Sequence, residues 1–348
     1  MVTALSQAAD TRAALAGPLL DVRSLTTTIT LRHAVVRPVD DVSFSVLPGE
    51  VFGLVGESGS GKTITALSIM RLIARPLRIS AGRVLLAGQD LLALPESRMR
   101  QVRGQEVSMV FQEPMTSLDP SFTIGRQITE TIHAHRKVSA EEARRRAVDL
   151  LERVGIPQPA SRLHSYPHQF SGGMRQRVMI AIALALEPRL LIADEPTTAL
   201  DVTLQAQILD LILSLQRESG LSMLLITHDL GVIAEVASRV AVMYAGEIVE
   251  AGPVRALFNS PRHPYTRGLL DSVASRGADE GSLKVIPGRV PELTHLPPGC
   301  RFAPRCANAL DRCWQEHPLL APDGPQRELR CFNPVAPAPL SGQHRSEP

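Results

Sequence analysis

The sequence predicts an α/β fold, in which polar residues lie at the carboxyl ends of parallel strands. The first observation is the stretch VFGLVGESGSGKTITALSIMRLI, which reads as a short apolar strand, a glycine-rich turn and a helix with apolar residues at helical spacing. The second is a pair of further apolar runs, RLLIADEP and LSMLLITHD, each of which ends in ionisable side chains. In parallel α/β sheets ligands bind at such strand ends, so we expect the functional residues there.

Composition and charge bear on the class of protein. The chain has 348 residues, long enough for one large domain with an appendage or for two domains, and its 37 basic residues nearly balance 35 acidic ones. This balance gives no indication of binding to nucleic acid or to an anionic membrane. We see no secretory signal, and the most apolar region, residues 178–193, contains charged residues and is too short to cross a bilayer. We therefore expect a cytoplasmic protein.

Proline divides the chain into a regular part and an irregular part. Residues 1–251 hold 12 of the 27 prolines, whereas the much shorter remainder holds 15. We expect a disordered N-terminus over residues 1–18 and a regular domain over 19–251. A loop-rich C-terminal domain over 252–333, without enough apolar residues for a core of its own, and a disordered tail over 334–348 should follow.

The glycine-rich turn matches a phosphate-binding loop. Residues 56–63, GESGSGKT, fit the pattern G-x-x-x-x-G-K-[ST], in which glycines let backbone N–H groups wrap around phosphates at a helix N-terminus. In this pattern Lys62 reaches the β- and γ-phosphates, and Thr63 is a ligand of Mg²⁺. The alternative is a glycine-rich turn with a chance lysine, which the flanking strand and helix disfavour. The candidate nucleotide-binding residues are Gly56, Glu57, Ser58, Gly59, Ser60, Gly61, Lys62 and Thr63.

Three side chains at the ends of the other two apolar runs belong to a candidate hydrolysis site. Asp194 can hold Mg²⁺, and Glu195 can orient and polarise the attacking water. His228, at the end of the third run, could sense the γ-phosphate. Taken alone, an Asp-Glu pair after a strand is more often a solvated strand end, and a lone histidine is more often structural. A phosphate loop in the same chain favours the functional interpretation of both.

A second anion-binding turn lies within HQFSGGMRQRVMIAIALAL. Ser171 is a favourable N-cap, and Gly172 and Gly173 leave backbone amides open at the positive end of the following helix. More than a hundred residues separate this turn from the phosphate loop. A single nucleotide could hardly use both turns within one compact domain.

Five motifs in order resemble the ATP-binding subunit of an ATP-binding cassette (ABC) transporter. They are GESGSGKT, the glutamine of MVFQEPMTSLDP, SGGMRQR, LLIADEPTTALD and THD. The resemblance implies a P-loop NTPase with a RecA-like core, an antiparallel β subdomain and a helical subdomain over about residues 112–186. It also implies an ATPase coupled to transport across a membrane. In this family two subunits pair head to tail, so that the serine-glycine-glycine turn of one closes on the γ-phosphate held by the other.

The resemblance adds two residues and groups the candidates by role. Gln112 would contact Mg²⁺ and the attacking water, and Asp201 would lie at the interface between subunits, beside the catalytic glutamate. The implied catalytic residues are Lys62, Gln112, Glu195 and His228. The implied Mg²⁺ ligands are Thr63, Gln112 and Asp194, and the nucleotide would also be bound by Ser171, Gly172, Gly173 and Asp201.

One stretch departs from the family pattern. Family members usually stack adenine on an aromatic residue some twenty residues before the phosphate loop, but TTTITLRHAVVRPVDDV offers only the ring of His33. A surface histidine is the alternative interpretation of this residue. The residue that contacts the base is therefore left open.

The C-terminal third narrows the resemblance to one branch of the family. HPYTRGLL and PPGCRFAPRC resemble the subunits that energise uptake of oligopeptides, dipeptides or nickel. The implied partners are a second ATP-binding subunit, identical or related, two transmembrane permease subunits and an external substrate-binding protein, with no nucleic acid. The implied location is the cytoplasmic face of the cell membrane, as a peripheral subunit. A soluble cassette ATPase that acts on nucleic acid or the ribosome is the alternative from another class, and a nickel importer is the alternative within the branch.

All four cysteines lie in this C-terminal region. Cys300, Cys306, Cys313 and Cys331 are separated by five, six and seventeen residues, without the C-x-x-C spacing typical of zinc sites, and each has an arginine as a neighbour. Four thiolates suit an iron-sulfur cluster or zinc, and adjacent arginines would stabilise thiolates. Because related tails in the branch resemble a 4Fe-4S binding module, we expect a 4Fe-4S cluster, with zinc or no metal as alternatives.

Overall fold

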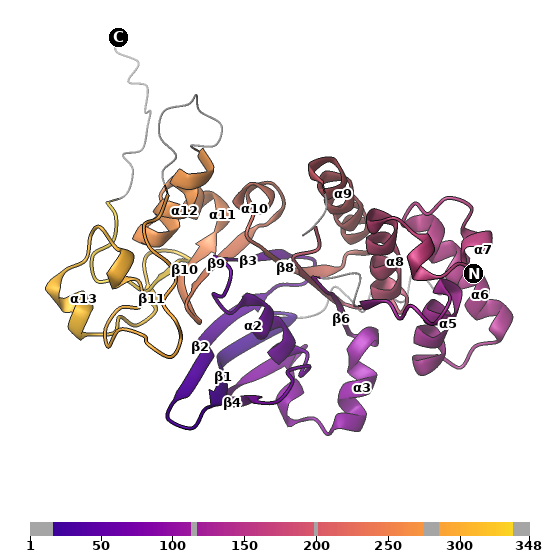
Figure 1. The fold of residues 1–348 in the computed structure, drawn as a ribbon, viewed down its shortest axis with the longest axis horizontal. Coiled ribbons are helices and arrows are strands. Elements are labelled where there is room, and N and C mark those ends of the chain that lie inside the picture. The colour runs from indigo at the N-terminus through magenta and orange to yellow at the C-terminus, as the bar shows by residue number, and fades with distance from the viewer. Residues whose placement is uncertain (1–16, 113–116, 198–200, 275–284, 337–348) are drawn as a thin grey trace, which may run out of the picture.

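The structure is a computed structural model that describes residues 17–112, 117–197, 201–274 and 285–336. Most of the two segments expected to be disordered, residues 1–18 and 334–348, lies outside the described residues. Two sheets and a group of helices make up the regular part of the chain. The C-terminal region lies at one end of the molecule, and the helices that follow residue 117 and precede residue 186 lie at the other (Figure 1).

The first sheet is antiparallel and has the strand order β2-β1-β4-β5. Its side chains alternate between the interior and solvent, as one-sided sheets require. In β1, for example, Leu20 and Val22 are buried, whereas Arg23 is exposed. The strands are β1 (Leu20–Thr30), β2 (Val35–Val46), β4 (Leu77–Leu86) and β5 (Gln89–Asp90).

The second sheet has the order β11-β12-β10-β9-β3-β8-β7-β6, and its five strands from β9 to β6 run parallel. The central strands are buried on both faces, which is why they read as continuous apolar runs. In β3, Val51 and Val55 face one core, and Phe52 and Leu54 face the other. The strands are β3 (Val51–Val55), β6 (Val107–Val110), β7 (Leu190–Asp194), β8 (Ser222–Thr227), β9 (Arg239–Tyr244), β10 (Glu247–Pro253), β11 (Ala321–Pro322) and β12 (Glu328–Leu329).

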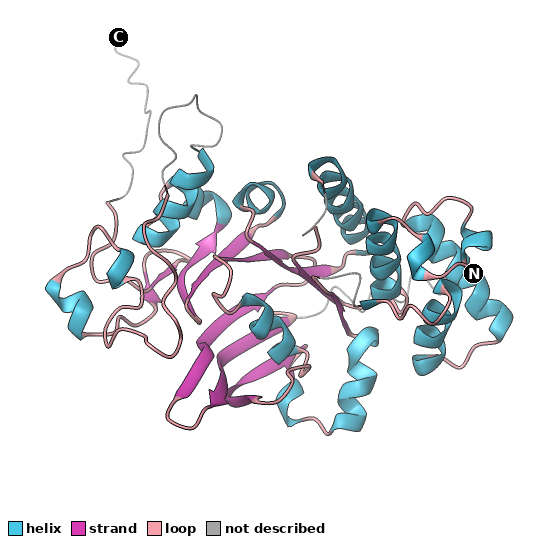
Figure 2. Ribbon diagram, in the orientation of Figure 1, coloured by secondary structure: helices cyan, strands magenta, loops and turns pink. Residues whose placement is uncertain are grey.

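Helices cover the sheets and form a separate group at one end of the molecule (Figure 2). Helix α2 (Lys62–Ile69) contacts both sheets. The other core helices are α3 (Glu96–Gln105), α9 (Val202–Ser219) and α10 (Leu230–Val236). The helical group, which falls within the range expected for the helical subdomain, contains α5 (Ile124–His135), α6 (Ala140–Arg153), α7 (Pro159–Arg162) and α8 (Gly172–Leu184).

The C-terminal region shares the core of the preceding domain. Tyr265 and Phe302 are buried in one cluster with Val55 of β3, and Tyr265 packs edge-on against Tyr244 with ring centroids 4.7 Å apart. Strand β12 also extends the larger sheet by pairing with β10. The region was expected to have too few apolar residues for a core of its own. Its aromatic residues instead complete the core of the preceding domain. Its helices are α11 (Val254–Asn259), α12 (Pro264–Ala274) and α13 (Asp311–Gln315).

His263, at the start of this region, should make stability depend on pH. Its side chain is buried, Nδ1 accepts a hydrogen bond from the Tyr265 backbone N–H at 3.0 Å, and burial lowers its pKa to about 3. The unfolded chain, with a histidine pKa near 6.5, takes up a proton first, so stability is lost as pH falls from about 6.5 towards 3. Between pH 7.5 and 5.0 this histidine should cost about 2 kcal/mol.

Urea unfolding at the two pH values measures this effect against matched variants. His263→Asn keeps a hydrogen-bond acceptor that does not titrate, so it should lose about 2 kcal/mol less on acidification than the unmodified chain. His133→Asn, a change at an exposed position, should lose as much stability on acidification as the unmodified chain. Equal pH dependence in the His263 variant and the unmodified chain would show that His263 is protonated in the folded state.

Candidate active site

A cavity of about 690 Å³ lies at the carboxyl ends of β3, β7 and β8. Its size is within the usual range for small-molecule sites. It brings together nine of the residues that the sequence analysis selected: Glu57, Ser58, Gly59, Gly61, Lys62, Thr63, Gln112, Glu195 and His228. Three further residues, Pro38, Ile64 and Leu293, also line it.

The glycine-rich loop has the backbone conformation that a phosphate cradle needs. Gly59 and Gly61 have φ values of +79° and +108°, which side chains rarely adopt. A Cβ at Gly61 would lie 2.3 Å from the Pro38 carbonyl oxygen, so only glycine fits there. Ser60 Oγ is buried and has no hydrogen-bond partner among the described residues. A backbone in which a Cβ would not fit, at the start of a helix, fits a nucleotide phosphate.

Lys62 begins α2 and places its ammonium group among carbonyl and carboxylate oxygens. Its side chain is 5% exposed, and Nζ donates to the carbonyl oxygens of Gly56 at 2.8 Å and Glu57 at 3.0 Å. Burial lowers the pKa of Lys62, whereas the carboxylates of Glu195, Asp194 and Glu57 act in the opposite direction. The first turn of α2 contains no acidic residue, so this helix start is open to an anion.

Asp194 and Thr63 form an oxygen pair suited to a divalent cation. Thr63 Oγ1 donates a hydrogen bond of 3.2 Å to Asp194 Oδ1 at the end of β7. Burial raises the pKa of Asp194 to about 6, and the negative charge of Glu195 acts in the same direction. A cation at this position would replace the proton, because it compensates the buried carboxylate. Mg²⁺ usually takes one or two protein carboxylates together with substrate phosphates, and these two residues fit that pattern.

Glu195 is the side chain on which the other polar residues converge. Gln112 Nε2 and His228 Nδ1 each lie 3.4 Å from its Oε2, and Lys62 Nζ lies 3.9 Å from its Oε1. The Glu195 backbone has a φ of +45°, an unfavourable conformation for a residue with a side chain. Its side chain is 13% exposed and lines the cavity, so it can accept a hydrogen bond from water there.

The serine-glycine-glycine turn and Asp201 lie outside this cavity. Ser171 caps α8 by accepting a hydrogen bond from the Met174 N–H at 3.3 Å, and Ser171 and Gly172 are exposed. Gly173 is buried against α9, where a Cβ would lie 2.5 Å from Leu204. Asp201 is exposed and caps α9 by accepting from the Leu204 N–H at 2.9 Å. None of these four residues lines the cavity of its own chain.

Comparisons with known proteins identify the family. The sequence model for the ABC transporter family matches residues 39–198, and that for the oligopeptide/dipeptide transporter C-terminal region matches residues 249–313. A peptide import ATP-binding protein of Brucella melitensis is 54% identical over 327 residues, which cover 90% of this chain and 97% of that protein. The chain belongs to the ABC transporter family. A second such protein, from Brucella abortus, is 50% identical over 314 residues, with 90% and 94% covered.

Solved structures agree with the assignment to the ABC transporter family. The ATP-binding cassette MJ0796, in a dimeric post-hydrolysis state bound to ADP and Pi, has a TM-score of 0.61 and 28% identity, with 68% of this chain and 99% of that chain covered. CbiO1 from Clostridium perfringens has a TM-score of 0.58 and 25% identity, with 69% and 90% covered. The predicted α/β fold with an antiparallel subdomain and a helical subdomain is confirmed. Within the described residues, no helix has the length and apolar character needed to span a membrane.

The expected 4Fe-4S cluster is wrong for this member of the ABC transporter family. Among the described residues, no group of three or more His, Cys, Asp or Glu side chains is placed to hold a metal ion. Burial raises the pKa of Cys300 to about 11 and that of Cys331 to about 12, so a metal at these thiols would have to displace two strongly held protons.

The neighbouring arginines do not stabilise thiolates either. Arg301 pairs with Asp40 and lies 3.1 Å from Glu247, and Arg312 pairs with Glu316 at 2.8 Å. Arg305 pairs with Glu57, and Arg330 donates to the carbonyl oxygens of Ile248 and Pro318. Spacing and composition could not distinguish these ion pairs from support for a metal centre.

Sequence reasoning missed the residues that reach the nucleotide cavity from the C-terminal region. Tyr265 Oη accepts a hydrogen bond from the Glu57 backbone N–H at 2.9 Å, although HPYTRGLL indicated only the branch of the family. Leu293 also lines the cavity from the C-terminal region, and Pro38 lines it from β2. His33 is exposed and does not line it. Tyrosine and arginine in a proline-rich region were visible in the sequence, but nothing there indicated that Tyr265 and Arg305 contact Glu57.

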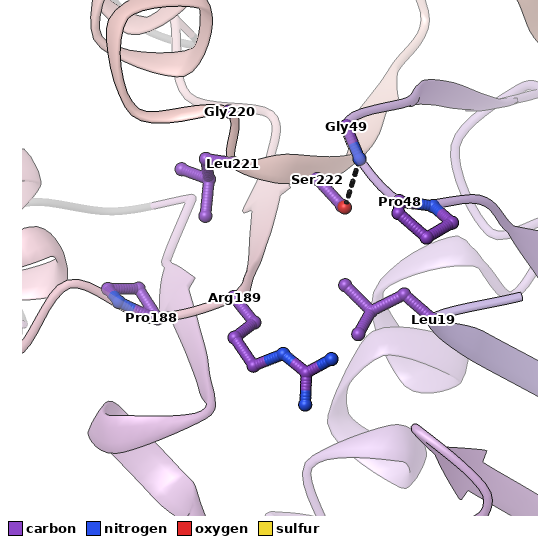
Figure 3. Close-up of a pocket in the computed structure, with 8 residues that line it drawn as sticks. All are labelled: Leu19, Pro48, Gly49, Pro188, Arg189, Gly220, Leu221 and Ser222. Carbon is purple, nitrogen blue, oxygen red and sulfur yellow. Dashed lines mark hydrogen bonds between the residues drawn. The ribbon is translucent and has the colours of Figure 1, made fainter. Parts of the chain in front are cut away.

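A second cavity, at the opposite ends of the parallel strands, is too small for a nucleotide. Its volume is about 30 Å³, and it is lined by Leu19, which precedes β1, and by residues at the amino ends of β3, β7 and β8 (Figure 3). The Gly49 N–H donates to Ser222 Oγ across it at 2.8 Å. Such a volume holds about one water molecule. The carboxyl ends of the strands therefore carry the candidate site.

Proposed function

We propose that this chain is the ATP-binding and ATP-hydrolysing subunit that energises the import of peptides through a membrane permease. One observation carries the proposal: the chain has a phosphate loop that lines a cavity and a second anion-binding turn, exposed at Ser171 and Gly172, that does not line this cavity. A second subunit, paired head to tail, would supply that turn to the nucleotide. The names of the relatives and the match to the oligopeptide/dipeptide C-terminal region support a peptide as the transported substrate.

The chemistry follows from the charges around the cavity. Lys62 and the loop amides would offset the negative charge of the phosphates. Bound Mg²⁺ would neutralise phosphate charge, and Thr63, Asp194 and Gln112 are the residues that would hold it. Glu195 would accept a hydrogen bond from the attacking water. Gln112 and His228, each 3.4 Å from Glu195 Oε2, would orient the Glu195 carboxylate before the reaction.

The proposed partners are those of a peripheral subunit. They are a second ATP-binding subunit, identical or related, two permease subunits and an external binding protein that acts through the permease. The subunit would lie on the cytoplasmic face of the membrane.

Sedimentation velocity tests the pairing on which the proposal depends. Glu195→Gln with Mg²⁺ and ATP should shift from monomer to dimer, because bound ATP that is not hydrolysed keeps the two sites closed. Glu195→Gln combined with Ser171→Arg should stay monomeric, since a bulky cation would stand where the turn approaches the partner. Glu195→Gln combined with Ser161→Arg, a change at another exposed serine of the helical group, should still dimerise. ATP-dependent dimers in all three variants would contradict a role for Ser171 in pairing.

A further inference from the structure

An ion pair between side chains joins the C-terminal region to the phosphate loop. Arg305 Nη1 lies 2.6 Å from Glu57 Oε2, and Arg305 Nη2 lies 3.1 Å from Glu57 Oε1, so the pair is bidentate. The two residues are 248 positions apart in the sequence. The Arg305 side chain is 4% exposed and that of Glu57 is 32% exposed, because Glu57 lines the nucleotide cavity.

Arg305 is held rigidly on its own side of the contact. Its Nε donates to the Pro287 carbonyl oxygen at 2.9 Å, and Nη1 lies 3.5 Å from Tyr244 Oη. Its backbone belongs to a 3-10 turn, Ala303–Arg305, in which the Arg305 N–H donates to the Phe302 carbonyl oxygen. The guanidinium is therefore held in place by contacts within the chain.

Glu57 is contacted at three separate groups. Arg305 binds its carboxylate, Tyr265 accepts from its backbone N–H, and Lys62 Nζ donates to its carbonyl oxygen at 3.0 Å. Two of these three contacts come from the C-terminal region. The position of the Glu57 backbone, to which Lys62 donates a hydrogen bond, thus depends on residues beyond 251.

Charge gives the ion pair a role beyond shape. Glu57 carries a carboxylate on the wall of the cavity into which the negative phosphates would enter. Without a partner, this carboxylate would repel them, since like charges in a partly buried site interact strongly. We infer that Arg305 is a positioning residue of the nucleotide site, which orients the Glu57 carboxylate and neutralises its charge from the C-terminal region. This inference rests on the proposed ATP-binding function.

Fluorescence titration of the full chain with a methylanthraniloyl derivative of ATP, in the presence of Mg²⁺, tests the inference. Arg305→Gln leaves the Glu57 charge unpaired and should weaken binding about tenfold, equivalent to about 1.4 kcal/mol. Glu57→Gln should bind at least as tightly as the unmodified chain, because it leaves the positive charge of Arg305 without an opposing carboxylate beside the cavity. The double variant should return to within about threefold of the unmodified chain, since it has no net charge at the pair.

Three further measurements separate a role in binding from a general loss of structure. Arg312→Gln removes the same charge from an exposed ion pair in the same region, and it should bind the nucleotide normally. At saturating ATP, Arg305→Gln should hydrolyse within about twofold of the unmodified rate, so that KM changes and kcat does not. Raising the salt concentration should narrow the difference in affinity between Arg305→Gln and the unmodified chain, because the repulsion is electrostatic.

Several outcomes would overturn the inference. Arg305→Gln binding as tightly as Arg312→Gln would do so, and so would a double variant as weak as Arg305→Gln alone. Should Arg305→Gln not fold, Glu57→Gln still decides, since weaker binding by this variant contradicts neutralisation as the role of Arg305. If the unmodified chain fails to bind the nucleotide, the proposed function itself is wrong, which is a separate result.

Discussion

Glu195→Gln should abolish most ATP hydrolysis while ATP binding is retained. The substitution keeps the size of the side chain and its contact with Gln112, but it removes the carboxylate that would polarise the attacking water. Loss of a general base typically slows a reaction by about 10²- to 10⁴-fold, and we expect a decrease in kcat in this range. Phosphate release at saturating ATP measures turnover, and nucleotide titration measures affinity.

A matched substitution shows whether the loss is specific to Glu195. Glu218→Gln changes another glutamate, one whose side chain is 65% exposed at the end of α9, and it should hydrolyse ATP at the unmodified rate. The affinity of Glu195→Gln for ATP should stay within about threefold of the unmodified chain, because Glu195 lies 3.9 Å from Lys62 and is not part of the phosphate loop. Normal turnover by Glu195→Gln would remove this residue from the proposed role.

Lys62→Ala should cause the largest loss of ATP binding. Lys62 is the only lysine or arginine among the described residues that line the cavity, and its side chain is almost fully buried. A charge-assisted hydrogen bond contributes about 1.5–3 kcal/mol, so the loss of this ammonium group should weaken binding about 10- to 100-fold or more. Isothermal titration with ATP and Mg²⁺ provides the measurement.

The control for this prediction is an exposed lysine. Lys137→Ala, at an exposed position that follows α5, should bind ATP like the unmodified chain. Far-ultraviolet circular dichroism should show that Lys62→Ala remains folded, since its substitution leaves the carbonyl oxygens of Gly56 and Glu57 beside a cavity that water can enter. Unchanged affinity in folded Lys62→Ala would contradict the proposed role of this lysine.

Local patterns predicted the parts of the site that are continuous in sequence. The apolar run before the glycines became β3, the loop conformation required glycine at position 61, and Ser171 caps α8 as expected. These features depend on neighbouring residues, because hydrogen bonds at a helix start and backbone φ values are set locally. The order of the motifs extended this success to the family and the fold.

The contacts between the C-terminal region and the nucleotide cavity could not be predicted in this way. Glu57 and Arg305 meet only because β9 and β10 carry the C-terminal region to the side of β3, and no local pattern encodes that path. The prediction of a 4Fe-4S cluster at the cysteines was wrong for a related reason. Their spacing shows neither whether thiols converge nor how deeply Cys300 and Cys331 are buried, and burial is the main cause that raises their pKa values.

The shared core has a consequence for cooperativity. Because Tyr265 and Phe302 complete the apolar cluster around Val55, a chain cut after residue 251 would expose a hydrophobic surface and lose the edge pairing of β12. The two regions matched by separate family models should therefore melt in a single calorimetric transition, and limited proteolysis should not release a stable fragment that ends near residue 251. The smallest unit of this chain that folds independently then extends into the C-terminal region, past the boundary between the two sequence matches.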